Sequence, residues 1–206
     1  SIILVKELRE KETMDEIEKI AKMISDTLST ELNVKVYISI GTVVSDLKDV
    51  SRSYKEAKMA LEVGKIFEND KYIVNYEKLG IGRLIYQLPL SLCKMFIKEV
   101  LHGLTMDDFD DETLATVNKF FENNLNVSET SRQLYIHRNT LVYRLDKLQK
   151  MTGLDLRNFD DAIIFKITLM VSKYMMYMDK MVYWYLALLN KGMGKDDLVD
   201  KHRTRY

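Results

Sequence analysis

The sequence has a single cysteine, a single proline and no net charge among its 206 residues. One cysteine, Cys93, excludes an internal disulfide framework and a cysteine-based metal site, and it fits a reducing compartment such as the cytoplasm. Basic and acidic residues are equally numerous, 31 of each, so no whole-molecule field attracts nucleic acid. Any attraction to a polyanion must therefore come from a local cluster of charges.

Long hydrophobic runs are also missing. The most apolar stretch, 162–189, is interrupted by Lys166, Lys173, Asp179 and Lys180, and a membrane-spanning helix needs about 18 or more apolar residues. The chain starts on Ser1 and continues with "IILV", with no signal peptide, and is interpreted as a piece of a longer protein. Hydrophobic residues make up 47% of the chain, which argues against disorder and predicts a globular protein without a membrane partner.

The N-terminal part alternates predicted strands and helices. Strands are expected at 1–8, at 33–44, where apolar and polar residues alternate, and at 71–76. Helices are expected at 14–28 and after Asp46, which can cap the second of them. This order of elements predicts an α+β fold class, with an α/β domain at the N-terminal end.

After Tyr76 the sequence predicts only helices. They are expected at 79–88, 90–103, 111–123, 127–134, 138–150 and from about Asp161. The acidic stretch "DDFDDE" (107–112) is interpreted as helix caps at a domain boundary rather than a cation site. We predict four parts, at 1–78, 79–104 (a helical connector), 105–178 and 179–206, the last of unknown role.

Residues 126–148 have the pattern of two short helices joined by a tight turn. Asn126 and Glu129 form a capping-box pattern for the first helix, and only Tyr135 and Ile136 separate it from the second. In the second helix an apolar stripe lies opposite polar residues with Thr140 and Arg144 on the flank. The stripe contains Leu141, Leu145 and Leu148, and the opposite face contains Asn139, Tyr143 and Lys147.

This segment is locally basic. Between 126 and 153 its basic residues oppose only Glu129 and Asp146, and they are Arg132, Arg138, Arg144, Lys147 and Lys150. A helix pair with a cationic second helix is typical of a helix-turn-helix, whose second helix enters the DNA major groove. Arginine can bind guanine and asparagine adenine, while Thr, Tyr and Lys can contact phosphate. The alternative is an ordinary solvated helix or an oligomerisation module with incidental basic residues.

The stretch "NVSETSRQLYIHRNTLVYRLDKLQKMTGLDL" (126–156) resembles the C-terminal helix-turn-helix of PucR/CdaR-type bacterial transcriptional regulators, a relative of the Fis-type helix pair. Ser131 stands where the family usually has alanine, a substitution of similar size. The resemblance implies binding to double-stranded DNA as a homodimer or larger homo-oligomer. The DNA-facing residues it implies are Arg138, Asn139, Thr140, Tyr143, Arg144 and Lys147, with Ser128, Arg132 and His137. For His137, a helix cap or phosphate contact is favoured over a metal ligand.

The stretch "VKVYISIGTVVSDLKDVSRSYKEAKMALEVGKIF" (34–67) resembles the second half of a degenerate GGDEF-like domain. A cyclase needs carboxylates that hold metal ions, and these come largely from a "GGDEF" turn expected before Ser1. We therefore expect no enzyme activity and no cofactor, with any small-molecule effector bound by a domain absent from this chain. The alternative is a nucleotide-cyclase-related fragment or a cyclic-dinucleotide sensor.

Overall fold

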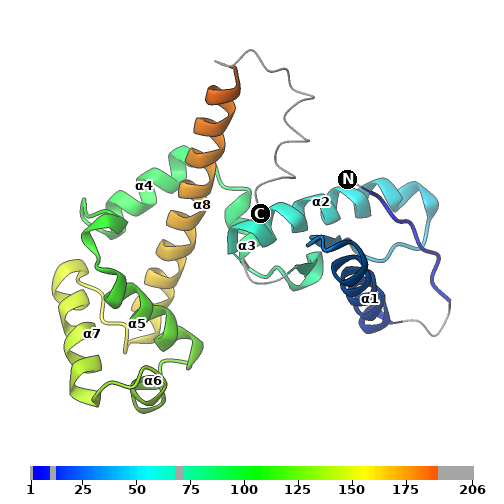
Figure 1. The fold of residues 1–206 in the computed structure, drawn as a ribbon. Helices are drawn as coiled ribbons and strands as arrows, with labels where there is room; N and C mark the ends of the chain where they lie inside the picture. Colours follow the sequence, from blue (N-terminus) through cyan, green and yellow to red (C-terminus); the bar gives the residue numbers. More distant parts are fainter. Residues whose placement is uncertain (1, 10–12, 68–71, 190–206) are drawn as a thin grey trace. The chain divides into compact units, whose positions relative to one another are not determined.

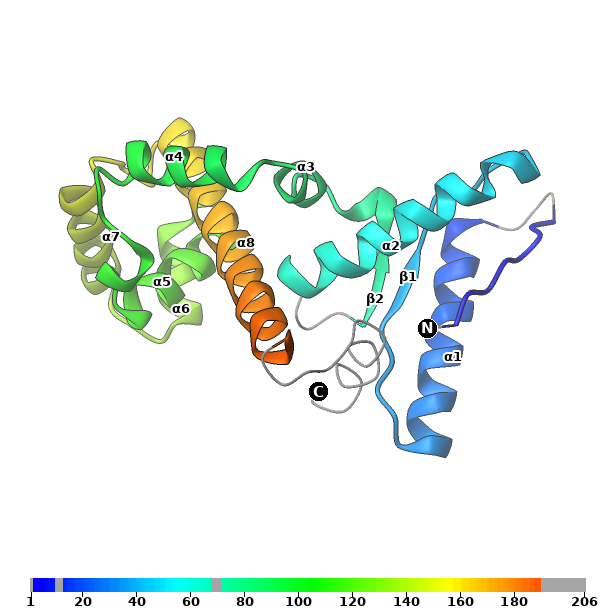
Figure 2. The same ribbon diagram turned by 90° about the horizontal axis from the view of Figure 1, so that it is seen from above.

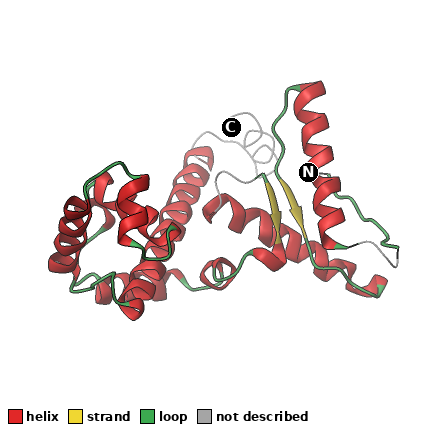
Figure 3. Ribbon diagram, turned by 90° about the horizontal axis from the view of Figure 1, so that it is seen from below, coloured by secondary structure: helices red, strands yellow, loops and turns green. Residues whose placement is uncertain are grey.

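The computed structural model describes residues 2–9, 13–67 and 72–189, with the side chains of 184–189 left aside. The chain divides into two compact units, residues 1–86 and 87–206 (Figure 1). The first contains a small parallel sheet and the second, where it is described, only helices and loops (Figure 3). The α+β fold class is therefore confirmed. The four-part division of the chain stays a prediction.

The first unit is built around two short parallel strands. Strand β1 (Ile38–Ile40) pairs with β2 (Ile73–Asn75), with Ser39 opposite Val74. Helix α2 packs across both strands and helix α1 contacts β2 from the other side (Figure 2). The elements of this unit are α1 (Met14–Leu32), β1, η1 (Leu47–Asp49), α2 (Val50–Phe67), β2, η2 (Tyr76–Lys78) and α3 (Gly82–Tyr86).

The contact between β1 and α2 explains the "SIG" sequence at the end of β1. A Cβ atom on Gly41 would lie 2.1 Å from the backbone oxygen of Ser53 in α2, so only glycine fits there. Ser53 donates a hydrogen bond to the carbonyl of Thr42 (2.7 Å), which fastens the same crossing. The small core beneath α2 consists of Ala60, Val63, Val74 and Leu79.

Three expectations for the first unit need correction. Residues 2–9 form no strand, and the apolar side chains at 2–5 are exposed, with Ile2 97% accessible. The predicted strand at 33–44 is reduced to three residues, because only Ile38–Ile40 have a partner strand among the described residues. Asp46 precedes η1 rather than α2, and its side chain makes no capping hydrogen bond in this part of the structure.

The second unit contains α4 (Leu90–Val100), η3 (Met106–Asp108), α5 (Asp111–Glu122), α6 (Val127–Gln133), α7 (Arg138–Thr152) and α8 (Phe159–Leu189). Helix α4 packs against α8, and α5, α6 and α7 contact one another around a core to which Phe165 and Leu169 of α8 contribute (Figure 1). Phe109 and Phe165 meet edge to face with ring centroids 6.0 Å apart. The core of the unit is formed by Leu101, Phe109, Val117, Phe120, Leu141, Leu145, Leu148, Leu156 and Phe165.

The second unit contains a buried cysteine and, as the sequence predicts, acidic helix caps. Cys93 is buried in α4, and its burial raises the pKa of the thiol. Asp108 and Asp110 serve as helix caps: Asp108 accepts from the Thr105 amide (2.7 Å) and Asp110 from the Thr113 amide (2.6 Å).

Over the part of the chain that the structure describes, no helix combines the length and apolarity needed to cross a membrane. Within the predicted tail, 179–206, residues 190–206 lie outside the described residues.

Candidate nucleic-acid interface

Helix α6 begins with half of the predicted capping box. The side-chain oxygen of Asn126 accepts a hydrogen bond from the Glu129 amide (2.9 Å). The Glu129 carboxylate does not return to Asn126, because it binds Arg132 (2.8 Å) and Gln133 (2.6 Å). These two bonds lower the pKa of Glu129, Arg132 first and Gln133 second. Arg132 thus lies exposed on α6 with its charge already paired.

The turn between α6 and α7 is closed by backbone hydrogen bonds. The amide of Tyr135 donates to the Arg132 carbonyl (3.2 Å) and the amide of Ile136 to the Ser131 carbonyl (3.1 Å). Ile136 packs against the core, whereas Tyr135 has a φ of 54° and is 96% exposed. The turn therefore fixes α7 on α6 and places an exposed aromatic ring beside the start of α7.

Helix α7 begins at a histidine cap. Nδ1 of His137 accepts a hydrogen bond from the Asn139 amide (3.2 Å), which confirms the predicted capping role. Arg138, Asn139 and Thr140 follow in the first turn, and all three side chains are exposed. Among the described residues, no hydrogen bond or ion pair engages the side chains of these three. The first turn of α7 therefore carries polar groups that are available to a ligand.

The apolar face of α7 agrees with the predicted helical phase. Leu141, Leu145 and Leu148 are fully buried, and Tyr143 on the opposite side is 69% exposed. These leucines pack α7 against α5 and α6, so the first turn of α7 and Tyr143 face away from the core. On α6, Ser128 is exposed as well, and its carbonyl accepts from the Ser131 hydroxyl (3.0 Å).

Arg144 and Lys147 have a different environment. The Arg144 side chain is 14% exposed, pairs with Glu112 of α5 and donates to the Thr116 hydroxyl (2.8 Å). The Lys147 ammonium group donates to Asp110 at the start of α5 (2.7 Å). These contacts correct the charge balance read from the sequence, because α5 brings two carboxylates to a segment that appears almost purely basic.

The ion pair between Lys147 and Asp110 changes the acidity of both groups. The hydrogen bond from Lys147, followed by that from Thr113, holds the pKa of Asp110 far below its usual range. The same bond raises the pKa of Lys147. Both groups are therefore charged at neutral pH, and Asp110 also caps α5.

The loop after α7 is fastened by one arginine. Arg157 pairs with Asp146 (2.9 Å) on α7 and with Asp155 (2.7 Å) in the loop, and it donates to Gln149 (3.0 Å). Helix α7 ends at Gly153, whose φ of 78° suits glycine. The "TGLDL" stretch thus anchors the C-terminal end of α7.

The sequence interpretation missed four residues of this surface. The acidic stretch predicts helix caps but no ion pairs for Asp110 and Glu112, because their partners lie 37 and 32 residues away along the chain. Arg157 was not singled out, although the charges at Asp146 and Asp155 are a local signal for it. The sequence predicts Tyr135 only as a turn residue, and no sequence signal indicates its exposure.

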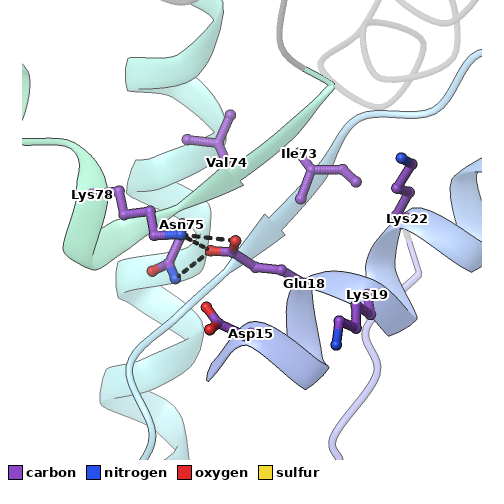
Figure 4. Close-up of a pocket in the computed structure, with 8 residues that line it drawn as sticks. All are labelled: Asp15, Glu18, Lys19, Lys22, Ile73, Val74, Asn75 and Lys78. Carbon is purple, nitrogen blue, oxygen red and sulfur yellow. Dashed lines mark hydrogen bonds and ion pairs between the residues drawn. The ribbon is translucent and has the colours of Figure 1, made fainter. Parts of the chain in front are cut away.

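A hollow of about 440 Å³ lies in the first unit between α1 and β2 (Figure 4). Glu18 reaches from α1 to Asn75 (3.1 Å) and Lys78 (2.8 Å), and these bonds, Lys78 first, lower the pKa of Glu18. These bonds pair the Glu18 carboxylate, whereas Asp15, which also lines the hollow, makes no hydrogen bond or ion pair among the described residues. The lining residues are Asp15, Glu18, Lys19, Lys22, Ile73, Val74, Asn75 and Lys78.

Helices α5, α6 and α7, with a tight turn before α7, define a helix-turn-helix protein. Comparison with known families specifies the class: residues 113–171 match the PucR C-terminal helix-turn-helix domain, and residues 1–63 match the GGDEF-like domain. The chain thus carries a PucR-type helix-turn-helix behind a GGDEF-like domain, as predicted.

Its relatives include named transcriptional regulators. The chain is 27% identical over 147 residues to the purine catabolism regulatory protein of Bacillus subtilis (strain 168), covering 71% of this chain and 28% of the relative. It is 31% identical over 136 residues to the carbohydrate diacid regulator of Escherichia coli (strain K12), covering 66% and 35%. It is 28% identical over 162 residues to the proline-responsive transcriptional activator PutR of Bacillus subtilis (strain 168), covering 76% and 39%.

The chain therefore spans between 28% and 39% of the length of these relatives. Among solved structures, it is similar to the regulator of polyketide synthase expression from Bifidobacterium adolescentis, with 22% identity and a TM-score of 0.35. That similarity covers 60% of this chain and 50% of the other.

Proposed function

We propose that this chain is the DNA-binding part of a cytoplasmic bacterial transcriptional regulator, with α7 as the recognition helix in the major groove. The observation that carries the proposal is the first turn of α7, where Arg138, Asn139 and Thr140 are exposed without partners among the described residues. Below them the buried leucines hold the helix rigidly, so the polar groups are presented at fixed positions.

The proposed contacts divide into two kinds. Arg138 and Asn139 read base edges, because arginine and asparagine side chains match guanine and adenine in the major groove. Thr140 and Tyr143 contact phosphate or sugar, together with Ser128 and Arg132 on α6 and the His137 ring. Arg144 and Lys147 belong to the same surface, but they first have to release the carboxylates of α5.

We further propose that the regulator works as a homodimer or larger homo-oligomer. Helix α8 supports this, because several of its described apolar side chains are exposed, among them Tyr183 at 80%. A two-fold assembly would present two recognition helices to a two-part DNA site. Size-exclusion chromatography with light scattering measures the mass directly; a monomer at micromolar concentration would contradict this part of the proposal.

The GGDEF-like part has a supporting role without catalysis in this proposal. The relatives are regulators, and the central Glu18 carboxylate of the hollow in this unit is held by Lys78 and Asn75 rather than free for a metal ion. Effector binding is assigned to a part of the regulator outside these 206 residues, consistent with relatives of much greater length.

Fluorescence anisotropy with a short labelled duplex of random sequence tests the proposal. At low salt we expect micromolar binding that weakens steeply as salt is added, since each phosphate contact contributes a slope of about 0.9 in log K against log salt. Arg138→Ala and Asn139→Ala are compared with Lys94→Ala, which removes an exposed charge from α4. Because Arg138 also adds a positive charge to this surface, we expect Arg138→Ala to weaken binding to the random duplex at least several-fold. Asn139→Ala removes no charge and is expected to weaken it less, and Lys94→Ala is expected to leave it nearly unchanged. Equal effects of Arg138→Ala and Lys94→Ala on affinity, or no binding by the wild type, would contradict the proposed interface.

A further inference from the structure

Two cations of α7 are held by the start of one neighbouring helix. Arg144 pairs with Glu112 and Lys147 with Asp110, and the two carboxylates lie two residues apart at the N-terminal end of α5. Both cations come from the helix that is proposed to lie against DNA. Glu112 and Asp110 therefore neutralise two positive charges that could otherwise bind the phosphate backbone of DNA.

We propose that Asp110 and Glu112 compete with DNA phosphates for Lys147 and Arg144, and so lower the sequence-independent affinity of the helix-turn-helix. This inference rests on the proposed function of α7. Phosphate contacts provide essentially all of non-specific binding, whereas base-edge contacts provide sequence information. While the two cations are paired with carboxylates, they contribute less to phosphate binding, whereas Arg138 and Asn139 stay free to contact bases. The ratio of specific to non-specific DNA binding therefore increases.

The two ion pairs differ in how easily a DNA phosphate can replace the carboxylate. Lys147 and Asp110 are both about half exposed, at 46% and 48% of their side chains. Exposed ion pairs stabilise a fold only slightly, so a phosphate can replace Asp110 at little cost. Arg144 is mostly buried and also anchored to Thr116, so its guanidinium is released less readily. The geometry makes Asp110 the main competitor and Glu112 the weaker one.

Two hydrogen bonds hold the Asp110 carboxylate beside Lys147, where it can compete with a DNA phosphate. One of its oxygens accepts the Thr113 amide (2.6 Å) and the other accepts from Lys147 (2.7 Å). Asn can make the same cap, because its side-chain oxygen accepts the amide and asparagine is among the best N-cap residues. Asp110→Asn therefore removes the competing charge and preserves the start of α5.

The test measures binding of the whole chain to the short labelled duplex of random sequence over a series of salt concentrations. Asp110→Asn is expected to bind several-fold more tightly at low salt, and its log K against log salt to steepen by about 0.9, the contribution of one added phosphate contact. Glu112→Gln, a change at an exposed side chain, is expected to act in the same direction with a smaller effect.

Glu122→Gln is the matched control. It removes one carboxylate from the same helix, but Glu122 pairs with Lys119 within α5 and contacts neither Arg144 nor Lys147 among the interactions the structure describes. Any general effect of lowering the negative charge of the chain appears in this variant as well. We expect its salt slope to equal that of the wild type.

A double-variant comparison separates competition from a general charge effect. In a Lys147→Ala background, Asp110→Asn is expected to leave affinity and slope unchanged, because the cation it would release is gone. A wild-type slope in Asp110→Asn, or an effect equal to that of Glu122→Gln, would overturn the inference while the DNA-binding function stands. If neither the wild type nor the variants bind the duplex at low salt, both the function and the inference are wrong.

Discussion

Tyr135, in the turn of the proposed interface, has a backbone conformation that is uncommon for a residue with a side chain. Its φ of 54° lies in the left-handed region, where a Cβ atom crowds the following carbonyl, and its ring is almost fully exposed. Neither core packing nor a side-chain hydrogen bond within the described residues accounts for a tyrosine here. Strained residues that persist at a surface often serve binding, and Tyr135 lies directly before His137 and Arg138.

Replacing Tyr135 with glycine is expected to stabilise the fold. Glycine adopts this conformation without crowding, so Tyr135→Gly should raise the free energy of unfolding by about 1 kcal/mol. Urea denaturation followed by circular dichroism measures the change. Tyr135→Ala keeps the Cβ atom and is the control, for which we expect no gain; equal stabilisation by both variants would mean that the backbone strain is absent. If the ring contacts DNA, both variants lose affinity.

Asp110 gives the second unit a specific dependence on acid. Its pKa is lowered in the folded chain, mainly by Lys147, so the unfolded chain binds a proton there more readily than the folded chain does. The resulting stability is complete above the ordinary pKa of 3.8 and is lost as the pH falls below that value. We expect the wild type to lose more stability than Asp110→Asn between about pH 4 and pH 2. Urea titrations at several pH values make the comparison, and parallel acid curves would contradict the assignment.

At the scale of elements, the helices were far easier to predict than the strands. The predicted starts of α5, α6 and α7 agree with the structure, because capping residues and apolar periodicity are local signals. The strand predicted at 1–8 is wrong, since β-rich composition forms a strand only when a partner strand is available. The pattern at 33–44 overestimated β1 for the same reason.

The candidate site was predictable in the parts that depend on one helix. The buried leucines, the His137 cap and the exposed Asn139 and Tyr143 all follow from the phase of α7. The partners of Arg144 and Lys147 were not predictable, because they come from another helix and depend on how α5 packs against α7. Long-range ion pairs of this kind are fixed by tertiary structure and leave no periodic signal in the sequence.

The packing of α7 against α5 and α6 can be tested at Leu145. The side chain is fully buried in the core that joins α5, α6 and α7. Leu145→Ala should lower the free energy of unfolding by about 2–5 kcal/mol, while Leu145→Met, which nearly conserves volume, should cost less than about 1.5 kcal/mol. Chemical denaturation of both variants gives the two values. A small loss for alanine would show that α7 is not anchored through this stripe.

At the scale of the whole molecule, each unit has its own core. The described core cluster of the first unit is formed by residues within 60–79, and that of the second by residues within 101–165. All residues of the proposed interface lie in the second unit, and so do the carboxylates that pair with Arg144 and Lys147. DNA binding and its electrostatic restraint are therefore expected to be properties of the second unit.

A fragment of residues 87–206 should fold without the first unit and keep the DNA-binding properties of the whole chain. The core cluster around α5, α6, α7 and the start of α8 consists of residues of this unit, and a domain with its own core can fold alone. We expect a single cooperative thermal transition by circular dichroism and a salt slope for duplex binding within error of the full chain. Asp110→Asn in the fragment should steepen that slope as it does in the full chain. A fragment that folds cooperatively but binds with a shallower slope would mean that the first unit supplies phosphate contacts of its own.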